Sequence, residues 1–233
     1  MAAGTPRSVI VTVVLAVLVA GGALGGAGVI RWRATHSTGT PATSQKAPPT
    51  GVVGVFGCLV EPCTVLATTT VGGTEVNLVA DAGERSGRLR VGGPTSGSVI
   101  ETTITDMGVT LTPDSLQCVA GGPSACLIRG GHDGGIVGQI VVGRSDKWSA
   151  LETPYVSDAG YLALANINGD SAPEILAAQK SGCGRSDGAC PVYMQVFGIA
   201  GKMIGCTREY PRLDKLPGFG NLKLTEAALT PCG

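Results

Sequence analysis

The chain has 233 residues, with 17 basic and 17 acidic side chains and therefore a formal net charge of zero. Without a basic excess it cannot neutralise many phosphates, which excludes a nucleic-acid binder driven by bulk charge. Charged residues make up only 15% of the chain, too few for a coiled coil or a charged disordered protein. The 37 glycines and 14 prolines favour turns between short elements.

The segment from Ser8 to Ile30 carries no ionisable side chain. As a helix its 23 residues would span about 34 Å, enough for a bilayer core of about 30 Å. We therefore predict a transmembrane signal-anchor helix over residues 8–30, after a cytoplasmic stub of residues 1–7. The alternative is a cleaved signal peptide, whose apolar region is usually about 7–15 residues long. A tryptophan between two arginines at 31–33 is typical of a membrane interface and favours the anchor.

Two observations disagree about the side of the membrane on which the rest of the chain lies. Arg31 and Arg33 follow the apolar segment and only Arg7 precedes it, which by the positive-inside rule favours a cytoplasmic domain. Eight cysteines lie beyond the segment, and an even number of them is typical of an oxidising compartment. A cytoplasmic zinc site is the alternative, but the close pairs enclose four, seven and six residues, longer than most zinc spacings. We therefore expect a single-pass cell-membrane protein whose C-terminal domain is extracytoplasmic.

Residues 31–50 are rich in Thr, Ser and Pro and have no hydrophobic period, which predicts a semi-extended linker. Residues 51–233 form the predicted domain, which has 13 basic and 17 acidic side chains. This acidic balance is unsuited to nucleic acid or anionic lipid.

The domain is predicted to be mainly β, because short apolar runs alternate with Gly, Asp, Pro and Ser, and no long helical period occurs. Gly72-Gly73 joins two such runs and is typical of a hairpin turn. The last run is compatible with a strand or a short terminal helix. The expected strands cover residues 64–71, 74–80, 136–143, 161–167, 174–179, 192–198 and 221–229.

Three cysteine pairs suggest an internal repeat. The second cysteines of the pairs are 63 and 64 residues apart, and each is followed by an apolar run, a glycine turn and another run. We expect each repeat to be a hairpin stapled by a disulfide, although an accidental alignment is the alternative and eight cysteines allow 105 connectivities. The favoured pairs are Cys58 with Cys63, Cys118 with Cys126, Cys183 with Cys190 and, by elimination, Cys206 with Cys232.

One motif, LALANINGDSAPEILAA at 162–178, resembles the FG-GAP/VCBS repeat, whose core is Asp-x-Asn-Gly-Asp-Gly-x-x-Asp between two hydrophobic strands. The resemblance implies a four-stranded blade of a β-propeller, as in integrin α-chain heads, and hence a small propeller-like domain of about three repeats. Closed propellers have about four to eight blades. A compact three-bladed variant, closure through oligomerisation and another small β-domain therefore all stay open.

The same resemblance implies a weak calcium site formed by Asn166, Asn168, Asp170 and Glu174. Hard cations prefer such oxygen ligands, and glycine permits the tight turn between them. Asn166 stands where the family has its first Asp, Ser171 replaces the second Gly and Glu174 replaces the last Asp. With two carboxylates the expected affinity is low, and a metal-free turn is the alternative.

The sequence favours a non-catalytic binding or scaffolding module of the bacterial cell envelope, whose partner is an unknown envelope protein or glycan. The alternative is an extracytoplasmic hydrolase with unidentified catalytic residues. A G-x-S-x-G pattern occurs at 184–188, but it lies inside a cysteine pair and not between a strand and a helix, as a nucleophile elbow requires. We expect the neighbouring His132 and Asp133 to point in different directions.

Overall fold

The computed structural model describes residues 58–93, 97–183, 190–220 and 223–232, and this part of the chain is mainly β. Its only helices are short 3₁₀ turns. A search of these residues found no helix that is long and apolar enough to cross a membrane. The predicted stub, anchor helix and linker, residues 1–50, lie outside the described residues, so these expectations stay predictions.

In the described residues thirteen strands form three antiparallel sheets, each built from four consecutive strands, with β9 as an extra strand beside β7. Sheet 1 contains β1 (Thr64–Val71), β2 (Thr74–Ala80), β3 (Gly87–Val91) and β4 (Ser98–Glu101). Sheet 2 contains β5 (Leu116–Val119), β6 (Ser124–His132), β7 (Gly135–Arg144), β8 (Lys147–Ala150) and β9 (Tyr155–Ser157). Sheet 3 contains β10 (Leu162–Ala165), β11 (Glu174–Lys180), β12 (Val192–Gly198) and β13 (Met203–Cys206). The 3₁₀ turns are η1 (Ile104–Met107), η2 (Pro113–Ser115), η3 (Leu213–Lys215) and η4 (Glu226–Ala228).

Local sequence explains the two longest hairpins. Gly72 and Gly73 both have positive φ and connect β1 to β2, as predicted. Asp133 and Gly134 do the same between β6 and β7. Such two-residue turns match the right-handed twist of paired strands. The run at 221–229, for which a strand or a short terminal helix was expected, contains the short 3₁₀ helix η4 and no strand among its described residues, so the helical alternative holds there.

The sheets do not follow the cysteine repeat. Cys58–Cys63 precedes the first strand of sheet 1, Cys118–Cys126 joins the first two strands of sheet 2, and Cys183–Cys190 lies between the second and third strands of sheet 3. The pairs therefore mark short loops closed by disulfides: the second joins residues of adjacent strands, and the third closes the connection between β11 and β12. The expectation that every pair staples a hairpin is wrong for the first.

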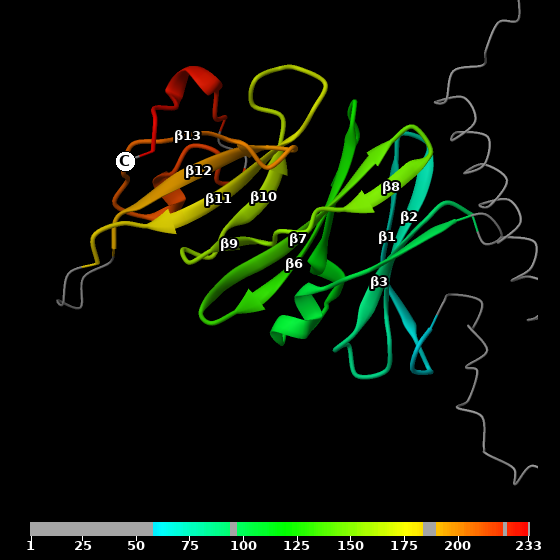
Figure 1. Ribbon diagram of the computed structural model, residues 1–233. Coiled ribbons are helices and arrows are strands. Elements are labelled where there is room, and N and C mark those ends of the chain that lie inside the picture. The colour runs from blue at the N-terminus through cyan, green and yellow to red at the C-terminus, as the bar shows by residue number, and fades with distance from the viewer. Residues whose placement is uncertain (1–57, 94–96, 184–189, 221–222, 233) are drawn as a thin grey trace, which may run out of the picture. The chain divides into compact units, whose positions relative to one another are not determined.

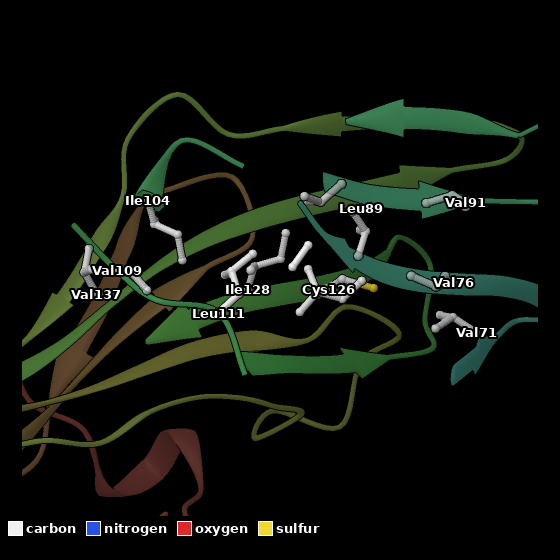
Figure 2. Packing of buried hydrophobic residues seen from close by; sticks show 13 residues of the cluster. Val71, Val76, Leu89, Val91, Ile104, Val109, Leu111, Cys126, Ile128 and Val137 are labelled. Carbon is white, nitrogen blue, oxygen red and sulfur yellow. The ribbon is translucent and has the colours of Figure 1, made fainter. Parts of the chain in front are cut away.

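Sheet 2 is the middle layer of the stack, between sheets 1 and 3 (Figure 1). Alternate residues of its strands face opposite ways, as the pleat requires. Cys126 and Ile128 pack against Leu78 and Leu89 of sheet 1, and Figure 2 shows the labelled side chains of both sheets meeting in this core. The β4–β5 connection fills the rest of it with Ile104, Val109 and Leu111.

The other face of sheet 2 packs on sheet 3. Leu127 and Ile140 meet Leu162 and Ile175 in a second buried cluster. At the margin of this interface the side-chain amide of Gln117 donates to the carbonyl of Leu164 (3.0 Å) and accepts from its N–H (3.1 Å). One side chain thereby satisfies backbone groups of β10, the first strand of sheet 3, which would otherwise lack a partner on that side.

The outer face of sheet 3 is covered by the C-terminal segment. Leu216 and Leu224 from this segment are buried against Leu176 and Met194. The Cys206–Cys232 disulfide fastens the end of the segment to β13. The described sheets do not close into a propeller, because the outer face of sheet 3 packs on the C-terminal segment and not on another sheet.

The outer face of sheet 1 is chiefly polar and contains the fully buried Arg88. Its guanidinium donates to Asp81 at 2.6 Å and lies 3.3 Å from Glu101. Burial alone would raise the pKa of Asp81, but hydrogen bonds from Ser86, Arg88 and the amide of Leu59 outweigh it and hold the pKa below its usual value. This buried ion pair joins the first disulfide loop to sheet 1.

Candidate functional site

The four residues predicted to bind calcium lie together in and beside the β10–β11 loop. The side-chain oxygen of Asn166 accepts from the amide of Gly169 (2.8 Å), and that of Asn168 accepts from the amide of Asp170 (3.0 Å). Asp170 accepts from the amide of Ala172 (2.6 Å) and from the side-chain amide of Asn168 (3.0 Å). The loop is therefore closed by its own polar side chains.

Glu174 occupies the buried end of this loop. It is the first residue of β11, is 2% exposed, and accepts from the amide of Ile167 at 2.8 Å. Burial raises the pKa of this carboxyl above its usual value, the hydrogen bond from Ile167 opposes the rise, and the nearby Asp170 carboxylate adds to it. Glu174 thus ties the two ends of the loop together.

The donor set partly fits a calcium ion. Two carboxylates and two side-chain amide oxygens lie within nine residues, but each takes part in hydrogen bonds of the loop itself. The described residues contain no group of three or more acidic, histidine or cysteine side chains placed to hold a metal ion. A bound ion would have to replace several of these hydrogen bonds, and calcium binding stays a prediction.

The loop also makes a direct contact with sheet 2. The amide of Gly122 donates to the carbonyl of Ser171 (2.6 Å), and the Ser171 hydroxyl donates to the carbonyl of Gly122 (3.2 Å). A Cβ on Gly121 would lie 2.2 Å from that same Ser171 carbonyl oxygen, so the approach requires glycine. The calcium-like motif therefore positions the β5–β6 turn, a role that its sequence does not reveal.

The structure pairs all eight cysteines as the sequence favoured. The disulfides are Cys58–Cys63, Cys118–Cys126, Cys183–Cys190 and Cys206–Cys232, and no free cysteine remains. Three of them close loops whose ends are only five to eight residues apart in sequence. Such short crosslinks restrict the unfolded chain locally.

A groove between sheets 1 and 2 lies beside the β5–β6 turn. It has a volume of about 470 Å³. One wall comes from the β1–β2 turn, and the other from the β5–β6 turn and the β7–β8 hairpin. Its lining consists of Val71, Gly72, Thr74, Gly121, Gly122, Pro123, Ser124, Gly143, Arg144, Ser145 and Trp148.

The indole of Trp148 lies across Gly143. The two residues face each other across β7 and β8, and a Cβ on Gly143 would lie 2.5, 2.6 and 2.8 Å from three atoms of the ring. Three nearly equal distances mean that the ring covers Gly143 with its face. Trp148 is half-buried against the core of sheets 1 and 2, so its remaining surface belongs to the groove.

The residues considered for hydrolysis are not brought into one site by the part of the chain that the structure describes. The G-x-S-x-G pattern at 184–188 lies outside the described residues. His132 Nε2 lies 3.2 Å from Asp133 Oδ2, so the expectation that these side chains diverge is wrong. Asp133 is largely exposed, at 89%; His132 ends β6, and Asp133 begins the turn to β7.

Comparison with protein-family models, curated proteins and solved structures found no match to this chain. Sequence reasoning did not find the groove. The sequence Gly-Arg-Ser-Asp-Lys-Trp at 143–148 could have indicated one wall of it, because a two-residue turn there places tryptophan opposite glycine in a hairpin.

Proposed function

We propose that this chain is a membrane-anchored, extracytoplasmic binding or scaffolding module of the bacterial cell envelope, without catalytic activity. The observation that carries the proposal is the pairing of all eight cysteines in four disulfides. Cytosolic reductants keep thiols reduced, whereas exported domains retain their disulfides. The helix at 8–30 would hold the domain at the membrane, and the linker at 31–50 would separate the two.

The described domain suits a binding role because its packed sheets hold the residues that line the groove in fixed positions. Each sheet contains a four-stranded meander comparable to a propeller blade, and the stacked sheets share two buried cores. The groove lies at the tips of hairpins from two different sheets. Binding residues commonly sit on turns that a rigid scaffold positions.

Sided labelling of intact cells tests this proposal. A membrane-impermeant amine reagent is expected to label lysines of the domain in intact cells, and protease added outside is expected to remove the domain. The chain is expected to stay with membranes after an alkaline carbonate wash, because the anchor is not cleaved. Labelling only after cell lysis would contradict the proposed location, and release by carbonate would contradict the anchor.

A further inference from the structure

The groove between sheets 1 and 2 has an aromatic surface with an unusual support. Because glycine stands opposite Trp148, the indole lies flat against the backbone of β7 and is held between the strand and the core. A rigid aromatic ring loses little conformational entropy when a ligand packs on it. The C–H faces of a pyranose ring are apolar and flat enough to pack on such a surface.

Arg144 gives the groove its charge. It is the only charged residue among those that line the groove, and it is exposed. Its backbone belongs to the β7–β8 pair, but its guanidinium makes no hydrogen bond or ion pair with any residue that the structure describes. A guanidinium binds a carboxylate through two parallel hydrogen bonds, so a free one beside an aromatic ring favours a carboxylate on the ligand.

Apart from Val71 and Pro123, the remaining lining residues are glycines or carry small hydroxyl side chains. Thr74, Ser124 and Ser145 contribute hydroxyl groups, and the backbone is exposed at three glycines of the lining, Gly72, Gly121 and Gly122. This lining offers no deep apolar pocket for the side chains of a peptide. It does offer the donors and acceptors that a ring with many hydroxyl groups requires.

We propose that this groove binds an acidic glycan, in which a pyranose packs on Trp148 and its carboxylate pairs with Arg144. The inference rests on the proposed binding function and names its ligand class. The ligand class is the uronic-acid oligosaccharides. An acidic peptide is the competing ligand, and the experiment below separates the two.

The test is isothermal titration calorimetry on the full chain in detergent with its disulfides intact. The probes are hexamers of galacturonate, of guluronate and of the glucuronate-containing repeat of hyaluronan, together with the methyl ester of the galacturonate hexamer and a hexaglutamate peptide. We expect at least one uronate hexamer to bind. The methyl ester of the galacturonate hexamer should bind about tenfold more weakly than its acid, because it lacks the charge that Arg144 recognises.

Variants assign the binding to the groove. Arg144→Gln should weaken the acid about tenfold and leave the methyl ester unchanged, whereas Lys147→Gln, in the same hairpin but outside the groove lining, should change neither. Trp148→Leu should weaken both forms by roughly tenfold or more, and Trp148→Phe should restore part of the loss. Gly143→Ala keeps the indole but displaces it, and should weaken both forms as well.

Different results would overturn the glycan assignment and the proposed binding function. If none of the uronate hexamers binds, or if binding is unaffected by Arg144→Gln and Trp148→Leu in variants with native circular dichroism, the glycan assignment is wrong. Binding of hexaglutamate alone, lost in the same variants, overturns the glycan and leaves the module a binder. The location of the domain is judged by cell labelling and does not depend on either titration.

Discussion

The buried ion pair of Asp81 and Arg88 allows a quantitative prediction. Both side chains are fully buried, and three donors converge on the Asp81 carboxylate, from Ser86 (2.7 Å), Arg88 (2.6 Å) and the Leu59 amide (3.0 Å). Asp81→Asn keeps the shape but replaces one acceptor oxygen by an NH₂ group and removes the negative charge. At least one donor then faces another donor, and the guanidinium loses a carboxylate that lies 2.6 Å away.

Removing one partner of a buried pair costs about 3–5 kcal/mol. Arg88 retains Glu101 at 3.3 Å, so we expect a loss of about 3 kcal/mol, the lower end of that range. With a urea m-value of about 2 kcal/mol/M, the midpoint of unfolding should fall by roughly 1.5 M. The assay is urea unfolding of the oxidised chain at pH 7, followed by far-ultraviolet circular dichroism.

Acid should remove this difference. The pKa of Asp81 is lowered in the folded chain, so its contribution to stability is present above the pKa of the unfolded chain, near 4, and is lost as the pH falls through the lower folded pKa. Wild type and Asp81→Asn should therefore converge towards pH 2. Asp214→Asn is the matched control, because its ion pairs with Arg212 and Lys215 are exposed. If Asp81→Asn is as stable as Asp214→Asn at pH 7, the account of this pair is wrong.

Four further predictions concern the loop, its contact with the β5–β6 turn, and the disulfide beside the groove. Burial raises the pKa of Glu174 in the folded chain, so this carboxyl stabilises the fold below the pKa of the unfolded chain, and the stabilisation is lost as the pH rises through the folded pKa. Glutamine resembles the protonated carboxyl. In chelator, Glu174→Gln should therefore have a higher melting temperature than wild type at pH 7 and the same melting temperature near pH 3. Millimolar calcium should raise the melting temperature of wild type but not of Glu174→Gln if the loop binds the ion, and an equal response of both would exclude Glu174 as a ligand. Gly121→Ala, whose Cβ would lie 2.2 Å from a carbonyl oxygen, should lower the free energy of unfolding in urea by about 1–3 kcal/mol. The control Gly131→Ala, which has open space around its Cβ, should change this free energy little, and equal losses in both variants would contradict the contact. Replacing Cys118 and Cys126 by serine should lower the free energy of unfolding by about 2–3 kcal/mol relative to wild type in the same assay. An unchanged urea midpoint would show that this disulfide does not stabilise the fold.

Much of the fold could be predicted from local pattern. The strands at 64–71, 74–80 and 192–198 were predicted within their true bounds, because apolar runs and turn residues define them. Sheet boundaries could not be predicted from the cysteines, because a disulfide between residues five to eight apart reports a closed loop and not the position of that loop within a sheet.

The site depends on contacts that local sequence does not encode. The segment Gly87–Val91 contains two arginines and was not predicted as a strand, yet it forms β3, in which Arg88 is buried beside Asp81 and Glu101. The groove exists because the turn after Val71 meets the hairpin that carries Trp148. That meeting follows from the stacking of two sheets and has no signature in either segment alone.

Thiol counting in the native cell tests the central claim, that the domain is exported and oxidised, most directly. Cells are lysed in acid to preserve thiol states, and the denatured chain is then alkylated with maleimide–polyethylene glycol before and after reduction. We expect no added mass before reduction and eight additions after it, since all eight cysteines are paired. Eight additions without reduction would place the domain in a reducing compartment and contradict the account.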